Sequence, residues 1–188
     1  QGYVEGTGAD ATLFTFPYDW RYGVSGKFPD GTSVADLLGQ KIEEIKQQTG
    51  VGKVDVVAHS MGGVLVKKYV MENPNSHSIG KAVFIGVPNT GAPKAIKVLL
   101  QGDNFDNWFL AESEMKKIAA NLPVVYDLAP SKQYYNQKGS YITVIEQGLI
   151  NYLSNELTYD GVNSFLENDH GLNAQAITNS ESLHTSFF

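Results

Sequence analysis

The sequence contains no cysteine, which excludes disulfide bridges, thiolate zinc sites and a cysteine nucleophile. It also has no run of roughly 20 apolar residues, the length a helix needs to cross a bilayer. Basic residues form no block, and the 188 residues carry 14 basic against 20 acidic side chains, a net charge of −6. Nucleic-acid affinity depends on clustered cations, so we expect no nucleic-acid partner. A cysteine-free chain can work in any compartment, and localisation stays open.

The remaining composition is that of a folded protein, with 42% hydrophobic and 18% charged residues. This length is enough to bury a core. The chain starts at Gln1 without methionine and stops on Phe187 and Phe188, two side chains that a fold would normally bury. We therefore expect it to be part of a longer protein.

The first half alternates short β-rich runs with amphipathic patterns. Ser33 and Asp36 resemble a helix start cap, and Gly50 ends the same pattern. Alternation of this kind is typical of an α/β fold in which helices cover a parallel sheet. The expected elements are strand 11–16, helix 33–48, buried strand 53–58, helix 61–72 and strand 81–87.

The second half is less regular. It suggests helices at 94–100 and 110–121 and a short strand at 141–146, and it becomes rich in Asn, Ser and Gly from residue 151. We interpret residues 1–100 as an incomplete sheet core and residues 101–188 as a mostly helical or irregular cap or lid.

Ser60 lies in the segment AHSMGG, residues 58–63, between an expected strand and an expected helix. A nucleophile elbow needs this context, because the serine must sit on a sharp strand-to-helix turn. Small residues at Ala58 and Gly62 would let the two elements approach. The N–H of Met61, at the positive end of the helix, would be one donor to an oxyanion. His59 adjoins the serine along the backbone, so we expect it to pack beside the site, not to act as the base.

A chance match of this short pattern is the alternative interpretation, and the flanking strand and helix argue against it. A phosphate-binding loop is excluded, because the glycines follow the serine and no Gly-Lys-Ser/Thr occurs.

Two further stretches follow strand ends. Residues 16–21 (FPYDWR) combine Asp19 and Arg21, for which we favour a buried ion pair that fixes the loop, with Tyr18 and Trp20 as candidate substrate contacts. Residues 86–93 (GVPNTGAP) read as a stiff turn at the same sheet edge.

Together, residues 18–21 (YDWR), 59–63 (HSMGG) and 86–93 resemble the lecithin:cholesterol acyltransferase-like branch of the α/β-hydrolases. Residues 124–130 also look like that family's lid, and the resemblance covers about residues 2–135. It implies an α/β-hydrolase-type sheet and a lipid-like acyl-ester substrate. Ser60 would attack this ester to give an acyl-enzyme, which passes its acyl group to water or an alcohol.

The same resemblance implies residues that this chain lacks. The family's second oxyanion donor comes from a His-Gly loop after an earlier strand, and this chain begins downstream of that loop. The family's acid usually lies in a Gly-Asp-Gly-like turn, and no such turn occurs here. We expect the acid and base beyond residue 188. Within the chain, the candidates are His184 as base and Asp169 as acid. Asp127 falls in lid-like sequence, and His170 adjoins Asp169 too closely for one to orient the other.

In the family's sheet order, a strand that this chain lacks lies between strands 11–16 and 53–58. Without it, backbone groups on both sides of the gap have no partner. The isolated chain should then be unstable, or be completed by missing segments of the parent chain or by a strand-exchanged homo-oligomer.

Two function classes remain open. One is a serine esterase, lipase or acyltransferase that opens at a lipid surface; the other is a catalytically incomplete hydrolase-fold piece that acts as a binding module. Nothing demands a metal or a cofactor, although a calcium site near Asp103 and Asp106 stays open beside the favoured interpretation as solvated surface. Aromatic and apolar residues of the second half would shape an acyl pocket or simply pack a core: Trp108, Phe109, Leu110, Tyr134, Tyr135 and Tyr141.

Overall fold

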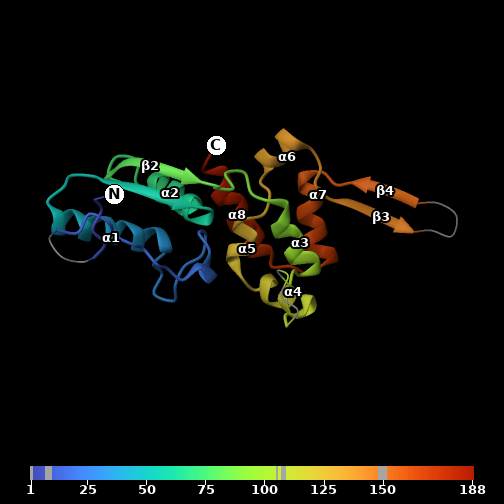
Figure 1. Cartoon of the computed structure of the whole chain (residues 1–188). Coiled ribbons are helices and arrows are strands. Elements are labelled where there is room, and N and C mark those ends of the chain that lie inside the picture. The colour runs from blue at the N-terminus through green and yellow to red at the C-terminus, as the bar shows by residue number, and fades with distance from the viewer. Residues whose placement is uncertain (1, 7–9, 105, 107–108, 148–151) are drawn as a thin grey trace. The chain divides into compact units, whose positions relative to one another are not determined.

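The computed structural model describes residues 2–6, 10–104, 106, 109–147 and 152–188, so Gln1 and Trp108 lie outside the described residues. The chain divides into two compact units (Figure 1): Gln1–Asn89 with Ser186–Phe188, and Thr90–Thr185. This division falls at residues 89 and 90, whereas the sequence placed the boundary near residue 100. Helix α3 (Pro93–Gln101) therefore belongs to the second unit.

The first unit opens its regular structure with helix α1 (Val34–Thr49). The Ser33 hydroxyl accepts a hydrogen bond from the Asp36 N–H, and the Asp36 carboxylate accepts one from the Ser33 N–H, so both ends of a capping box are present. Gly50 ends the helix in the left-handed conformation, with φ of 72°. The sequence-based prediction of this helix and of its cap is confirmed.

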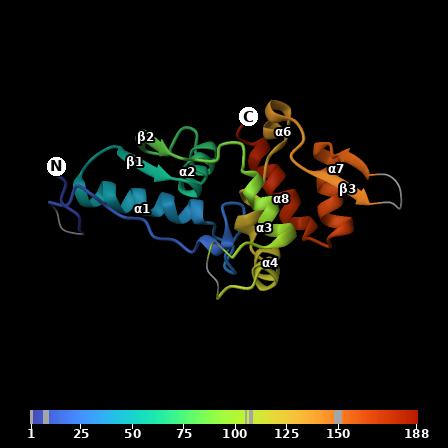
Figure 2. The ribbon, with the colours of Figure 1, turned by 45° about the vertical axis from the view of Figure 1, so that its right-hand side comes forward.

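A parallel β–α–β arrangement follows α1. Strand β1 (Val54–His59) pairs with strand β2 (Ile79–Ile85), and helix α2 (Met61–Glu72) connects them. Helices α1 and α2 pack against each other and against β1 (Figure 2). This is the α/β class that the sequence predicted, with a small parallel sheet covered by helices.

The predicted strand 11–16 is wrong. The backbone N–H groups of Thr12 and Leu13 both donate to the carbonyl of Val4, and Leu13 forms an isolated bridge with Glu5. This segment therefore pairs with residues immediately before it and adds no strand to β1 and β2. Among the described residues, the parallel sheet consists of β1 and β2.

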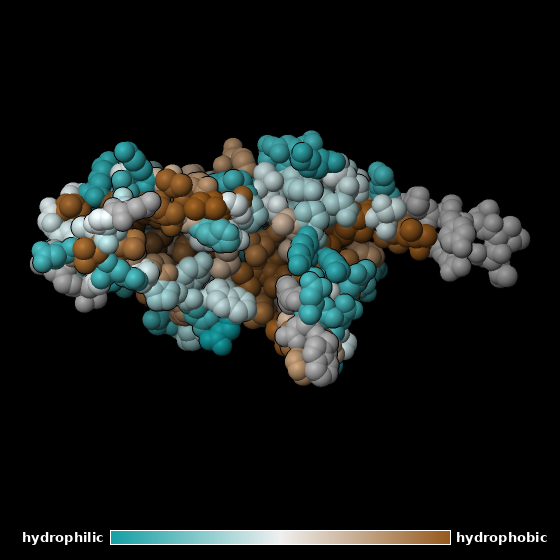
Figure 3. Space-filling view, in the orientation of Figure 1, coloured by the Kyte–Doolittle hydropathy of each residue, from teal (hydrophilic) through white to brown (hydrophobic). Residues whose placement is uncertain are grey.

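One face of this sheet is open, although the sequence predicted that strand 53–58 is buried. Val57 pairs with Val83 and His59 with Ile85, and paired residues point to the same face. On that face Val57 is 71% exposed, Val83 53% and Ile85 51%. Ala58, which faces the helices, is buried. Figure 3 shows hydrophobic residues gathered over β2.

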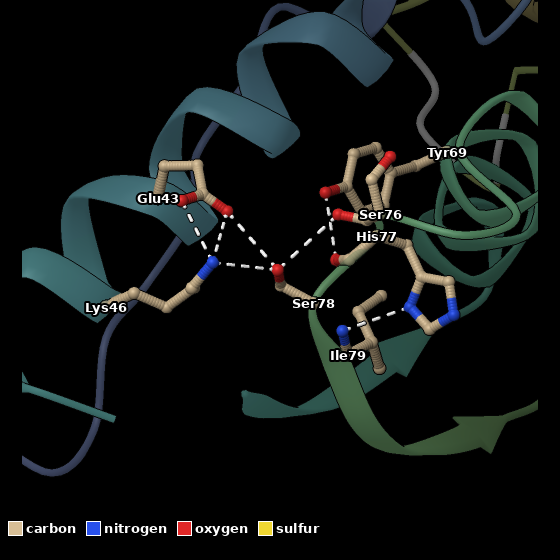
Figure 4. Close-up of polar contacts among 7 residues, drawn as sticks. All are labelled: Glu43, Lys46, Tyr69, Ser76, His77, Ser78 and Ile79. Carbon is tan, nitrogen blue, oxygen red and sulfur yellow. Dashed lines mark hydrogen bonds and ion pairs between the residues drawn. The ribbon is translucent and has the colours of Figure 1, made fainter. Parts of the chain in front are cut away.

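A polar network holds the start of β2 (Figure 4). Ser78 has a positive φ of 54°, and its hydroxyl accepts a hydrogen bond of 2.8 Å from Lys46 Nζ, which also pairs with Glu43 at 2.7 Å. The Tyr69 hydroxyl donates to the His77 carbonyl at 2.9 Å. These contacts join α1 and α2 to the loop before β2 and so fix where that strand begins.

The second unit is mainly helical and contains one antiparallel hairpin. Its core includes Ile96, Leu99, Tyr126, Val162 and Leu166. The helices expected at 94–100 and 110–121 and the strand expected at 141–146 are present with shifted ends. Besides α3, the elements are α4 (Glu112–Ala120), α5 (Pro123–Asp127), α6 (Lys132–Lys138), β3 (Thr143–Gln147), β4 (Tyr152–Glu156), α7 (Tyr159–Ser164), the π-helical turn η2 (Phe165–Asp169) and α8 (Ala174–Thr185).

Candidate active site

Ser60 occupies the turn between β1 and α2 in a strained backbone conformation. Its φ is 51° and its ψ −127°, the mirror image of a common turn conformation and one that favours glycine. For a residue with a side chain, such a conformation is unfavourable by roughly 1–3 kcal/mol, and strain of this kind concentrates at functional sites. Ser60 is half-buried and its side chain makes no capping hydrogen bond to α2. The strand–turn–helix context expected of a nucleophile elbow is therefore present.

The surrounding backbone holds this turn in place. The Ser60 N–H donates to the carbonyl of Ile85 at 2.9 Å, which extends the β1–β2 pairing by one residue. The Ser60 carbonyl accepts from the Gly63 N–H at 3.0 Å and starts the helix. Both bonds fix the backbone of Ser60 and leave its hydroxyl outside the hydrogen-bond pattern of the helix.

Small residues let α2 approach the sheet, and the tightest contact is one that sequence reasoning missed. A Cβ added to Gly62 would lie 4.0 Å from the Cβ of Ala58, an ordinary contact. A Cβ added to Gly63 would lie 2.1 Å from Val87 Cγ2, which is a severe overlap. The presence of Gly63 after Gly62 was the only sign of this close contact in the sequence. The contact itself could not be predicted, because Val87 lies 24 positions further along the chain.

Met61 provides the first N–H of α2, next to the Ser60 hydroxyl in sequence. The first N–H groups of a helix have no partner within the helix, and they lie at its positive end. This position suits a donor to developing negative charge on a substrate oxygen.

His59 is the last residue of β1 and is exposed. A Cβ built on Gly86 would lie 3.9 Å from His59 Nε2, so the imidazole lies beside the turn that leaves β2. Its position beside Ser60 at the carboxyl end of the sheet suits contact with a substrate.

The YDWR stretch forms a short 3₁₀ turn, η1 (Trp20–Tyr22), capped by Asp19. The Arg21 side chain makes two hydrogen bonds to the Asp19 carboxylate, at 2.8 and 2.6 Å. Hydrogen bonding by this side chain is the main reason why the pKa of Asp19 lies below its usual value. The predicted ion pair exists, but the prediction of burial is wrong, because the Arg21 side chain is 67% exposed. The two candidate substrate contacts of this stretch differ in exposure. Trp20 is 54% exposed, whereas Tyr18 is half-buried, and this burial raises the pKa of its hydroxyl.

Residues 90–92 of the third stretch are anchored to residues 128–131 in the second unit. Ala92 N–H donates to the Leu128 carbonyl at 2.8 Å, and Ser131 N–H donates to the Thr90 carbonyl at 2.9 Å. Gly91 has a φ of 89°, and a Cβ there would lie 2.1 Å from the Ala129 carbonyl oxygen. The glycine of this turn is thus required by both conformation and space.

The candidate base His184 is buried in α8, where its Nε2 lies 2.9 Å from the backbone carbonyl oxygen of Asp127. Because a carbonyl oxygen only accepts, Nε2 carries the proton in this contact. Ser180 on the same helix donates to the Tyr126 carbonyl at 2.7 Å. In this structure His184 therefore helps to attach α8 to α5. The candidate acid Asp169 is exposed at the end of η2.

Asp103 is not solvated surface, as the sequence suggested, but is buried, with Lys94 and Lys97 at 3.5 and 3.6 Å from its carboxylate. Asp106, by contrast, is exposed.

In the described part of the chain, no group of three or more histidine and acidic side chains is arranged to hold a metal ion. Across the same residues, no helix combines the length and apolar character needed to traverse a bilayer.

The aromatic side chains of the second unit do not behave as one group. Phe109 is 72% exposed and Leu110 38%, which excludes both from the core. Tyr134 and Tyr141 are half-buried, and their rings meet edge to face at 5.7 Å. Tyr135 is half-buried as well.

Comparison with known proteins gives the family. The sequence model of the lecithin:cholesterol acyltransferases matches residues 2–185. The chain belongs to the lecithin:cholesterol acyltransferase family. The resemblance carried by the three stretches is thereby confirmed.

Relatives within the lecithin:cholesterol acyltransferase family carry enzyme names. The chain is 30% identical to lecithin-cholesterol acyltransferase-like 4 of Arabidopsis thaliana over 68% of this chain and 24% of the relative. It is 28% identical to phospholipase A(1) LCAT3 of the same plant over 76% of this chain and 32% of the relative. With lysosomal phospholipase A and acyltransferase of Bos taurus the identity is 36% over 47% of this chain and 21% of the relative. The chain thus spans between a fifth and a third of the length of these relatives.

Proposed function

We propose that Ser60 is the nucleophile of an enzyme that hydrolyses or transfers lipid acyl esters. The observation that carries this proposal is the strained Ser60 conformation on a strand-to-helix turn, with φ of 51°. The names of the relatives, phospholipases and acyltransferases, supply the substrate class. Because the chain spans a fraction of those relatives, the activity of the whole protein is part of the proposal.

In the first step, Ser60 Oγ bonds to the ester carbonyl carbon and gives its proton to a general base. The carbonyl oxygen becomes an oxyanion, and the Met61 N–H donates to it. The carbon–oxygen bond to the leaving alcohol then breaks, and the alcohol departs with a proton. Water or a second alcohol attacks the acyl-enzyme in the same way and frees Ser60.

Other residues near the turn would contact the substrate. His59 lies beside Ser60 at the end of β1, and we assign it to the substrate-facing side. Trp20 presents an exposed apolar ring and Tyr18 a half-buried one, and we assign both to contact with the acyl ester. Such contacts suit binding at a lipid surface, because Tyr and Trp side chains combine an apolar ring with a polar group that can stay in water.

His184 remains our candidate base within the chain, and Asp169 the candidate acid. For Nε2 of His184 to take the Ser60 proton, the imidazole would have to give up its contact with the Asp127 carbonyl. The alternative that we propose is the one that the resemblance implies, namely an acid and a base beyond residue 188.

A fluorophosphonate probe tests the proposal, because it labels a serine that a base activates. The 188-residue chain is incubated with the probe, and the labelled peptide is identified by mass spectrometry. We expect labelling at Ser60 that is lost in Ser60→Ala. Ser78→Ala is the matched control, since Ser78 also has a positive φ but lies at the other end of β2.

Labelling that persists in Ser60→Ala would overturn the proposal. Absence of labelling in a chain shown to be folded by circular dichroism would mean that these 188 residues supply no base to Ser60, and it would overturn activity of this chain by itself. That outcome would favour the second candidate, a binding module without activity. The observation in its favour is the open apolar face of β1 and β2, because parallel sheets normally have both faces covered. We propose that a second copy of the chain, or further segments of a longer chain, cover this face.

A further inference from the structure

A groove of about 450 Å³ lies in the second unit, between α3 and the start of β3. Pro93, Ile96, Lys97 and Leu100 line one wall, and their spacing places them on a single face of α3. The opposite wall comprises residues 142–144 with Phe165 and His170. The volume lies within the roughly 300–1,000 Å³ that small-molecule sites occupy in proteins.

Aliphatic side chains form part of the lining of this groove, which also includes Lys97, Gln101, Tyr141 and Thr143. Ile96, Leu100, Ile142 and Val144 contribute branched side chains, and Phe165 is held by an edge-to-face contact with His170 at 4.6 Å between ring centroids. The described residues that line it include no acidic side chain. An unbranched hydrocarbon chain fits such walls, because it needs apolar contact and no hydrogen-bond partner.

The charge beside the groove is positive. Lys94 and Lys97 on α3 both lie near one carboxylate oxygen of Asp103, at 3.5 and 3.6 Å, and α3 contains no acidic residue. Together these three side chains carry two positive charges and one negative charge. Lys97 lines the groove and its side chain is 54% exposed, so its ammonium group can reach a ligand. This arrangement favours an anionic group at that end.

We infer that the groove binds a single long acyl chain with an anionic head group. The hydrocarbon lies between Leu100 and Val144, and the head group lies at Lys97. The inference rests on the proposed function in one respect, since acyl chains are the apolar ligands that such an enzyme would meet. Ser60 does not line the groove.

The test uses the 188-residue chain with Ser60→Ala, which prevents turnover. Binding of cis-parinaric acid is followed by its fluorescence, and unlabelled ligands of one chain length compete for the site: a fatty acid, a lysophosphatidic acid and the corresponding fatty alcohol. We expect both anions to displace the probe and the uncharged alcohol to be weaker by roughly threefold to tenfold. The ratio of the affinities for the fatty acid and for the lysophosphatidic acid shows whether the groove prefers a free fatty acid or a lysolipid.

Three variants locate the site. Leu100→Trp should fill the groove and abolish binding of acid and alcohol alike. Lys97→Met should weaken binding of the acids by roughly threefold to tenfold and leave the alcohol unchanged. Lys116→Met on α4 is the matched control, because it removes the same charge from a residue that does not line the groove, and it should change nothing.

Val144→Trp, on the opposite wall, repeats the filling test if Leu100→Trp does not fold. Unchanged binding in both Trp variants, or an alcohol that binds as tightly as the acid, would overturn the inference. Because every arm measures binding to a chain without the Ser60 hydroxyl, the result does not depend on whether the fluorophosphonate experiment succeeds.

Discussion

Gly63 in α2 lies so close to Val87 that a Cβ on the glycine would come within 2.1 Å of Val87 Cγ2. This pair sets how near the first turn of the helix lies to the segment that leaves β2. Since Ser60 stands immediately before that turn, the contact also limits where its backbone can be.

Gly63→Ala should destabilise the chain by about 1–3 kcal/mol, because the added methyl group overlaps Val87. Gly62→Ala introduces the same methyl group at a distance of 4.0 Å from the Ala58 Cβ, and it should be neutral or slightly stabilising. Urea unfolding measures both. The double variant Gly63→Ala with Val87→Ala should recover part of the stability that Gly63→Ala loses. If it recovers none, the overlap with Val87 is not the cause of that loss.

Ser60→Gly should be more stable than Ser60→Ala by about 1 kcal/mol, although neither has a hydroxyl. Glycine adopts the observed φ of 51° and ψ of −127° without steric strain, whereas alanine keeps the strain of serine. The difference in unfolding free energy is obtained from the midpoints of the urea unfolding curves of the two variants, which should share the same m-value. Equal midpoints for the two variants would argue against strain at this position.

Ser33→Ala should destabilise α1 by about 1 kcal/mol through loss of the cap. The hydrogen bond from the Ser33 side chain is the main reason why the pKa of Asp36 is lowered, with a smaller contribution from the Ser33 backbone. A lowered pKa in the folded state means that this stabilisation is present above the pKa of the unfolded chain, and disappears as pH falls through the folded value. Unfolding free energies between pH 7 and pH 3 should therefore decline less in Ser33→Ala than in the parent chain.

Replacing Val57, Val83 and Ile85 by threonine should reduce self-association, because the three side chains form the exposed apolar face of the sheet. Sedimentation velocity over a range of concentrations measures the effect. Val51→Thr with Met71→Gln changes exposed apolar residues outside β1 and β2, and should leave association unaltered. If the parent chain is monomeric at all concentrations, a second copy is excluded as the partner of this face.

The elements of the first unit from residue 33 onward were predictable because their signals are local. The Ser33 cap, the apolar spacing up to Ile45 and Gly50 give α1 to within one residue at each end. The turn at Ser60 was predictable from its flanking strand and helix. Strand 11–16 was not, because its β-rich composition says nothing of its pairing partner, which here is Val4.

Contacts between distant segments account for the remaining differences. Burial of Asp103 depends on Lys94 and Lys97, and the position of His184 depends on a backbone carbonyl 57 residues away. Helix α8 was missed because its sequence is polar and its hydrophobic periodicity is weak. The open sheet face escaped prediction since apolar strands normally indicate cover on both sides.

The hydrogen bond from the Ser60 N–H to the Ile85 carbonyl makes the turn dependent on the neighbouring strand. If the end of β2 separates from β1, this hydrogen bond breaks. Ser60 can then leave its strained backbone conformation. We propose that labelling of Ser60 by the fluorophosphonate probe declines in mild denaturant when the strand ends open, before the whole chain unfolds.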